Sequence, residues 1–207
     1  MKTGKYIVIE GQDGVGKSTQ VELLARFLRG RAQDVLTTRE PGGGLPATDT
    51  IRNLLKNKDH NLDSITHTLL FTANRRELWT KVIEPALAAG KTVISDRNWW
   101  STIAFEHYGM DVPLELVENL TKSCLPKRYV RPDFGLVMTL GNAERQRRLG
   151  GRDNNSKNDS YESRNDDFQR RVIDGYLEIA KNKQLLVIDA SPSPEEIHRQ
   201  IVSLLHF

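Results

Sequence analysis

Near its start the chain reads Gly11-Gln12-Asp13-Gly14-Val15-Gly16-Lys17-Ser18. This run fits the P-loop pattern G-x-x-x-x-G-K-[ST], in which glycines let backbone N–H groups turn inward around phosphate oxygens. An apolar run at residues 6–9 precedes the motif, and an amphipathic stretch that begins at Lys17 follows it. A chance match in a chain of this length has a probability on the order of one percent. The motif therefore predicts a nucleoside-triphosphate site.

All eight positions of this loop, together with Thr19, are expected to surround the phosphates of the bound nucleotide. The N-terminus of the following helix would add partial positive charge. Lys17 is predicted to reach the β- and γ-phosphates, and the Ser18 hydroxyl is predicted to ligate Mg²⁺. ATP and Mg²⁺ are therefore the expected cofactors.

Outward from the loop, strand and helix patterns alternate along the chain, which predicts an α/β fold with a mainly parallel sheet. Strands are expected at residues 5–10, 34–38, 91–95, 133–140 and 184–189. Helices are expected at residues 17–29, 63–89, 113–124 and 166–183, after Asn142 as an N-cap, and after a capping box at 193–196. The prediction is thus a three-layer fold of the P-loop NTPase type with a five-stranded sheet.

Two helices have predicted core-facing sides. The first carries Val21, Leu24, Ala25 and Leu28 on one face, and the long helical region at 63–89 carries Leu69, Leu70, Ala73 and Leu78, with a bend at Pro85. Residues 150–158 are polar and rich in glycine, which predicts a mobile loop. With no repeat and no interdomain linker, residues 1–207 are expected to form one domain.

Composition excludes several classes of protein. Hydrophobic residues make up 38% and charged residues 28% of the 207 residues, as in ordinary globular proteins. No apolar run is long enough for a membrane span or a signal peptide, so a cytoplasmic location is expected. The net charge of +3 is dispersed and no nucleic-acid motif appears, so no nucleic-acid partner is expected. Cys124 is the only cysteine, which excludes an internal disulfide.

A P-loop does not by itself separate kinases from GTPases or motor ATPases, although no guanine-reading Asn-Lys-x-Asp segment is present. Further segments of the chain separate these classes. They are Tyr6-Ile7-Val8-Ile9-Glu10-Gly11, Thr38-Arg39-Glu40-Pro41-Gly42-Gly43, Leu70-Phe71-Thr72-Ala73-Asn74-Arg75, and Asp96-Arg97 followed by Ser101, Thr102, Ala104 and Phe105. With these the chain resembles thymidylate kinases over nearly its whole length. The resemblance implies ATP- and Mg²⁺-dependent phosphorylation of dTMP to dTDP by a homodimer.

The resemblance also implies an acceptor site. Arg39 and Arg97 each follow a strand, at the sheet edge where ligands bind, and guanidinium forks suit a phosphate. Phe71 and Arg75 lie four residues apart on one helical face; in the family the aromatic ring stacks on thymine and the arginine bonds its O4 carbonyl. Core packing is the alternative for Phe71.

Four more residues complete the implied substrate site. Thr102 would bond the N3 edge of the pyrimidine, beside Ser101, and Phe105 would lie against the sugar and exclude a 2′-hydroxyl. Asp13 would accept a hydrogen bond from the 3′-hydroxyl; a cap for the following helix is its alternative role. Trp99 and Trp100 form a bulky stretch beside this expected sugar pocket.

The catalytic residues follow from the reaction. A phosphate monoester has a second pKa near about 6 and is largely dianionic at neutral pH, so the acceptor needs no strong base. Asp96 is therefore assigned to Mg²⁺, to its waters or to the orientation of Arg97, and the catalytic set comprises Lys17, Asp96, Arg97 and a lid arginine.

Within the family, the arginine that stabilises the transferring phosphoryl group lies either in the P-loop or in the lid. Gly14 occupies the P-loop position here, so the lid at about 143–164 must supply it, from Arg147, Arg148 or Arg152. Arg145 is expected to be a solvated helix end. Ala190, after the last strand, is expected to contact adenine.

Two other functions stay open at this point. One is a deoxynucleoside-monophosphate kinase with a wider base pocket. The other is an ATP-dependent switch protein without a small-molecule acceptor, which would leave Arg39, Phe71, Arg75 and Arg97 without a role.

Overall fold

A parallel sheet forms the centre of the molecule. The computed structural model describes residues 3–151, 161 and 164–205, and its five strands are ordered β2-β3-β1-β4-β5. The strands are β1 (Tyr6–Gly11), β2 (Val35–Arg39), β3 (Thr92–Asp96), β4 (Phe134–Thr139) and β5 (Leu186–Asp189). Every pair is parallel, which confirms the predicted α/β architecture.

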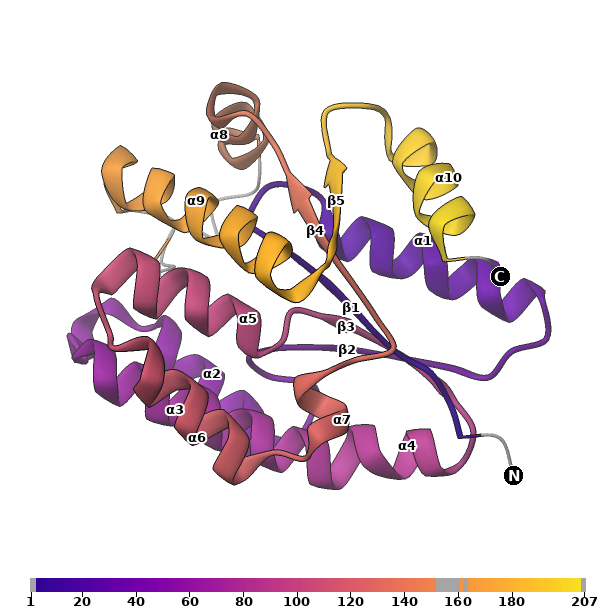
Figure 1. The fold of residues 1–207 in the computed structure, drawn as a ribbon, viewed down its shortest axis with the longest axis horizontal. Helices are drawn as coiled ribbons and strands as arrows, with labels where there is room; N and C mark the ends of the chain where they lie inside the picture. Colours follow the sequence, from indigo (N-terminus) through magenta and orange to yellow (C-terminus); the bar gives the residue numbers. More distant parts are fainter. Residues whose placement is uncertain (1–2, 152–160, 162–163, 206–207) are drawn as a thin grey trace.

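Helices cover both faces of this sheet (Figure 1). They are α1 (Lys17–Gly30), α2 (Pro46–Lys56), η1 (Lys58–His60), α3 (Ser64–Leu78), η2 (Trp79–Ile83), α4 (Glu84–Ala88), α5 (Trp99–Thr102), η3 (Ile103–Tyr108), α6 (Leu114–Cys124), α7 (Lys127–Val130), α8 (Asn142–Gly150), α9 (Asp166–Lys183) and α10 (Pro194–Leu204). Helices α1 and α10 pack on one face, and α3, α5, α6, α7 and α9 on the other. The layers are thus the three that were predicted.

The parallel arrangement places the chemistry at one edge. Parallel strands end on the same side of a sheet, where open α/β folds bind ligands. Arg39 pairs in register with Asp96, and Ile9 of β1 pairs with the same Asp96. The ends of β1, β2 and β3 therefore bring the P-loop, Arg39 and the Asp96-Arg97 pair together.

Helix α1 has the predicted buried face, with Val21, Leu24, Ala25 and Leu28 all in the core. The predicted face of α3 is confirmed only in part, since Leu78 is buried and Leu70 is half-buried. Leu69 and Ala73 are exposed, whereas the inward face carries polar residues, which are His67, Thr68, Thr72, Asn74 and Arg75. On this inward face Arg75 lines a cavity. The Asn74 amide donates to the Thr48 carbonyl at 2.9 Å, and His67 Nδ1 lies 2.6 Å from the Tyr161 hydroxyl.

Other local predictions need correction. Gly141, and not Asn142, is the N-cap of α8, and Asn142 is its first residue. The region at 63–89 is helical, but a π-helical segment, η2, separates α3 from α4. Pro85 lies in the first turn of α4. Helices α2, α5, η3 and α7 were not anticipated. Most of the loop predicted at 150–158, and much of the lid at about 143–164, lies outside the described residues.

Among the described residues, no helix is both long and apolar enough to cross a lipid bilayer.

Candidate active site

A cavity of about 290 Å³ opens at the carboxyl edge of the sheet, between the P-loop, the end of β2 and helices α2, α3 and η3. Its lining includes most of the predicted site residues, which are Asp13, Gly14, Gly16, Lys17, Ser18, Thr19, Arg39, Phe71, Arg75, Asp96, Arg97, Ser101, Thr102 and Phe105. Glu40, Pro41, Arg52, Leu55, Lys56 and Tyr161 complete the lining. Six lysines and arginines face three acids in this lining, a balance that suits an anionic ligand.

The P-loop has the backbone that a phosphate cradle requires. Gly11, Gly14 and Gly16 all have positive φ, at 135°, 92° and 94°. A Cβ on Gly11 would lie 2.3 Å from the Met138 carbonyl oxygen, so only glycine fits there. Gly16 is the N-cap of α1 and no side chain caps this helix, so its first N–H groups face the cavity without a capping partner. Asp13, inside the loop, accepts from Arg97 Nη2 at 2.8 Å.

Lys17 and the Ser18–Asp96 pair lie where the phosphates would enter. The Lys17 Nζ donates to the Gln12 carbonyl at 2.8 Å and lies 3.9 Å from Asp13 Oδ1. Burial lowers the pKa of this amine, and Arg97 lowers it further. The Ser18 Oγ donates to Asp96 Oδ2 at 2.7 Å. Two oxygen ligands of the kind that Mg²⁺ prefers thus lie side by side, next to the cradle.

Arg97 connects the P-loop to the elements around it. Its Nη1 donates to the Gly11 carbonyl at 2.8 Å, to Ser101 Oγ at 3.0 Å and to the Tyr176 hydroxyl at 2.7 Å. Its Nη2 donates to Asp13 Oδ1 at 2.8 Å. The residue has a φ of 79°, a left-handed conformation that is costly for a side chain of this size. In this conformation the guanidinium reaches back to Gly11 at the end of β1.

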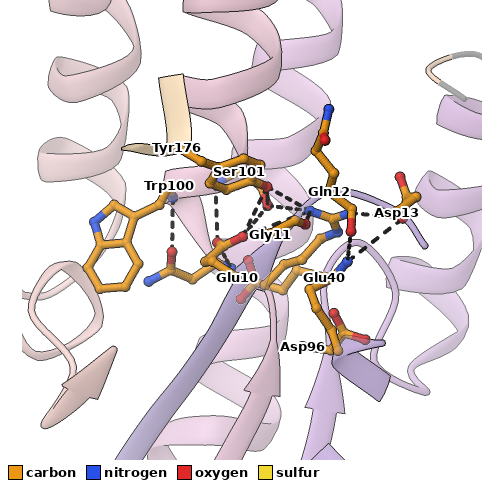
Figure 2. A network of polar contacts seen from close by, with 12 residues as sticks. Glu10, Gly11, Gln12, Asp13, Glu40, Asp96, Trp100, Ser101 and Tyr176 are labelled. Carbon is orange, nitrogen blue, oxygen red and sulfur yellow. Dashed lines mark hydrogen bonds and ion pairs between the residues drawn. The ribbon is translucent and has the colours of Figure 1, made fainter. Parts of the chain in front are cut away.

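Behind Arg97 lies a fully buried carboxylate that sequence analysis did not single out. Glu10 accepts from the Asn98 N–H at 2.7 Å and from the Ser101 hydroxyl at 2.6 Å, and it lies 3.8 Å from Arg97 Nη1. Figure 2 shows Glu10, Ser101 and Tyr176 gathered around this point. Burial raises the pKa of Glu10, against the opposing effects of Arg97 and Ser101. Its signal in the sequence was an acidic residue at the end of an apolar strand.

The far end of the cavity is built on Arg75, which is 2% exposed. Its Nε donates to Glu40 Oε2 at 3.1 Å, and its Nη2 donates to the Thr102 hydroxyl. The Nη1 has no hydrogen-bond partner among the described residues. Phe71 lies beneath the guanidinium at 5.5 Å, and Phe105 borders the same cavity. The structure thus brings together the four residues predicted to surround a base and its sugar.

Glu40 accepts a hydrogen bond from Arg75, and its raised pKa makes the stability of the protein depend on pH. Its Oε2 also accepts from the Tyr129 hydroxyl at 2.7 Å. Burial raises the pKa of Glu40 from 4.5 to about 7, although Arg75 and Tyr129 lower it. Between these two pH values the folded state binds more protons than the unfolded state, so stability falls as pH rises.

We expect the wild type to lose about 3 kcal/mol of stability relative to Glu40→Gln between pH 4.5 and pH 8. Urea unfolding of both proteins over this range measures the difference. Glu118→Gln is the control, because Lys122 lowers the pKa of Glu118 below 4.5, so its titration lies below this range and its stability difference should stay nearly flat. A pH-independent difference for Glu40→Gln would contradict the raised pKa.

The remaining arginines that were predicted to act on phosphates differ in their surroundings. Arg39 is exposed at the cavity wall, and its guanidinium forms no hydrogen bond or ion pair with any described residue. Arg147 and Arg148 do not line the cavity; both pair with Glu144, at 2.7 and 2.8 Å, and these contacts lower the pKa of Glu144 to about 2. Arg152 lies outside the described residues.

Arg145 is not the solvated helix end that was predicted. It is 1% exposed and its Nη1 donates to the Asp13 carbonyl at 3.4 Å. The correction has a steric reason. A Cβ on Gly14 would lie 3.1 Å from the Arg145 Cγ, so this glycine leaves room for the arginine stem beneath the P-loop.

Several predicted residues do not line the cavity. Gly11, Gln12 and Val15 turn their side of the P-loop toward the core, and Ala190 is buried with its N–H bonded to Thr139. Trp99 and Trp100 are buried against β4, α7 and α9 instead of the expected sugar pocket. Their bulk fills the core because α5 turns them away from the Ser101 and Thr102 face.

Sequence reasoning missed Glu40, Tyr161 and Tyr176. Glu40 was visible within the quoted Thr38–Gly43 segment, as an acid next to proline and glycines. Tyr161 and Tyr176 had no local signal, since each acts through contacts with residues more than 50 positions away.

A P-loop, a serine–aspartate pair and a single cavity that extends from the loop to Arg75 and Thr102 together define a P-loop phosphotransferase. The comparisons agree. The family model for thymidylate kinase matches residues 9–201. Thymidylate kinases of Chlorobaculum parvum and Halothermothrix orenii are 38% and 35% identical, each covering 96% of this chain and 94% of the relative. A crystal structure of thymidylate kinase from Ehrlichia chaffeensis has a TM-score of 0.78 at 31% identity, covering 98% of this chain and 99% of that one. The chain belongs to the thymidylate kinase family.

Proposed function

We propose that this chain transfers the terminal phosphoryl group of ATP to the phosphate of dTMP, which yields dTDP and ADP. The observation that carries the proposal is the shared cavity. Lys17 and the Ser18–Asp96 pair lie at one end, and Arg75, Thr102, Phe71 and Phe105 line the other. A donor held by the P-loop would thus face an acceptor held by α3 and η3. The proposal treats residues 1–207 as one kinase domain with a lid at about 143–164.

The acceptor is a nucleotide in this proposal because each part of it finds a complementary group. Arg75 Nη1, buried without a described partner, is a donor for the O4 carbonyl of thymine, and Thr102 serves the N3 edge. Phe71 stacks on the ring and Phe105 lies against the sugar. Asp13, turned into the cavity by Arg97, accepts from the 3′-hydroxyl.

The acceptor phosphate lies between Arg39 and Arg97. Arg39 is the guanidinium with its donors available, so it supplies the bidentate contact. Arg97 already donates to Asp13, Ser101 and Tyr176, so its larger contribution is to keep the carboxylate and the P-loop in place. The phosphate oxygen is deprotonated near neutral pH and attacks without a general base.

At the donor end, Lys17 moves from the Gln12 carbonyl to the β- and γ-phosphates. Ser18 and Asp96 would hold Mg²⁺, which neutralises charge on the phosphates when bound. We propose that a lid arginine, Arg147, Arg148 or Arg152, reaches the transferring group. Arg147 and Arg148 would first separate from their present partner, Glu144. Adenine would lie near Ala190.

An acceptor panel tests the function. Purified protein with ATP and Mg²⁺ is mixed in turn with dTMP, dUMP, dCMP, dGMP, dAMP and UMP, and ADP formation is followed. Fast turnover with dTMP, slower turnover with dUMP and little with the rest is the expected result. Similar rates across several bases would indicate a broad deoxynucleotide kinase. A lack of acceptor-dependent ADP would refute the kinase assignment and leave only the P-loop.

Arg75→Ala should raise the KM for dTMP about a hundredfold and leave ATP binding nearly unchanged. The reason is that Arg75 serves only the base end of the cavity, and a site built to bond a base loses strongly when its donor is removed. Arg76→Ala is the matched control. Arg76 follows Arg75 on α3, but it is exposed and donates to the Cys124 carbonyl. Initial-rate kinetics, with dTMP and ATP varied in turn, give the KM for each substrate. Equal losses for both ligands would count against a base-reading role.

We also propose that the protein is a homodimer in the cytoplasm. Ile65 and Leu69 are each 48% exposed on α3, one helical turn apart, and Ala73 continues the row. Apolar residues in such a row are typical of a helix that packs against a partner. Sedimentation of the wild type and of Leu69→Glu measures the oligomeric state. We expect a dimer for the wild type and a monomer for the variant.

A further inference from the structure

Beside the acceptor cavity lies a buried polar cluster that the proposed reaction does not use. It consists of His67 on α3, Glu106 on η3 and the hydroxyl of Tyr161. His67 is 5% exposed and Glu106 is 0% exposed. Three polar side chains from three distant segments are thus held in the apolar interior, and such an arrangement is costly unless every group is well placed.

The hydrogen bonds in this cluster run in one direction. The Tyr161 hydroxyl donates its proton to Glu106 Oε1, so it can only accept from His67. The His67 Nδ1 lies 2.6 Å from that oxygen, which places a proton on Nδ1. The hydroxyl is therefore held from two sides, and its ring has little freedom to rotate or withdraw.

The ring of Tyr161 belongs to the wall of the cavity. It contacts Phe105 at 5.2 Å between ring centroids and Phe71 at 6.4 Å. These are the two aromatic residues assigned to the base and the sugar. The Tyr161 backbone is held as well, since its carbonyl accepts from Gln169 Nε2 at 2.8 Å, and Gln169 in turn accepts from the P-loop residue Gln12.

We propose that His67 and Glu106 are positioning residues for the acceptor site: they hold the Tyr161 ring as a third aromatic wall beside Phe71 and Phe105. The inference rests on the proposed function, because dTMP is taken as the occupant of this cavity. His67 and Glu106 contact no substrate; they act through the tyrosine hydroxyl.

Tyr161→Phe is the sharpest test, since it keeps the ring and removes both hydrogen bonds. The backbone bond to Gln169 also remains, so the link to the P-loop is unaffected. We expect the KM for dTMP to rise about tenfold, with kcat and the KM for ATP changed less than twofold. His67→Leu and Glu106→Leu should each give a similar rise. In the Tyr161→Phe background neither should add to it, because all three changes break one unit.

Conservative variants and a control separate positioning from mere stability. Glu106→Gln keeps an acceptor and His67→Asn keeps a donor near Nδ1, so both should recover most of the dTMP affinity. Thr121→Val removes a buried hydrogen bond to the Val117 carbonyl far from the cavity, and it should lower the melting temperature without moving either KM. The folded state of each variant is checked by near-UV circular dichroism.

The results separate the two proposals. A wild type that does not turn over dTMP would refute the proposed function. An active wild type whose KM for dTMP is unchanged in Tyr161→Phe, or in which the KM for both substrates rises equally, would overturn only the positioning role. Additive effects of His67→Leu and Tyr161→Phe would also overturn it.

Discussion

Lys17→Met should lower kcat about a thousandfold with no loss of stability. The Nζ is the expected cation of the cradle, and Lys17 is only 6% exposed, so its charge should act on the phosphates with less screening than a surface lysine has. Removing one such group from a preorganised site costs about 10² to 10³ in rate. The pKa of Lys17 is lowered by burial, so the charged amine costs folding free energy, and methionine should leave the free energy of unfolding equal or higher.

Single-turnover kinetics with saturating ATP and dTMP measure the chemical step, and urea unfolding measures stability. Lys91→Met is the control, because Lys91 is an exposed lysine that pairs with Asp34 on the surface. If Lys17→Met lost stability and activity together, the lysine would be a structural residue and the loop would not be acting as a phosphate cradle.

Arg97→Ala should lower kcat/KM for dTMP about a thousandfold and destabilise the fold by about 3 to 5 kcal/mol. Both effects come from one guanidinium. It holds Asp13 at 2.8 Å and the Gly11 carbonyl at 2.8 Å, so the loop and the carboxylate that faces the acceptor both lose their anchor. Glu10, fully buried 3.8 Å away, is left without its cation, which is the costly outcome for a buried charge.

Arg97→Lys separates charge from geometry. A single ammonium cannot serve Gly11, Asp13, Ser101 and Tyr176 at once, so stability should return in part and kcat/KM should not. Arg26→Ala, at an exposed pair with Glu22, should change stability by less than about 0.5 kcal/mol. Full activity in Arg97→Lys would show that a point charge suffices and that the network around the fork is incidental.

Much of the site could be predicted because its residues follow one another in short runs. The P-loop pattern, the Asp96-Arg97 pair at a strand end and the spacing of Phe71 and Arg75 each depend on local geometry alone. Parallel strands then bring such runs to one sheet edge, whatever the intervening chain does. The cavity accordingly collects residues from the loop, from the end of β2, from α3 and from η3.

The errors occurred where a residue's environment depends on distant partners. Apolar spacing predicted an inward face through Leu69 and Ala73, yet α3 turns His67 and Arg75 inward. There Tyr161 contacts His67, and Glu40 and Thr102 accept hydrogen bonds from Arg75. Arg145 was assigned to solvent because a basic helix end ordinarily is solvated. Its burial depends on Gly14, 131 positions earlier, which leaves space under the loop.

By itself the sequence determined the P-loop, the alternation of strands and helices, and the family, since these follow from motifs and patterns within short runs of residues. Tertiary structure decided which charges are buried and which partner each one has. Glu10 with Arg97, Glu40 with Arg75, and Glu106 with Tyr161 are pairs 87, 35 and 55 positions apart. A buried charge is tolerated only where such a partner arrives, and that arrival is a property of the folded chain.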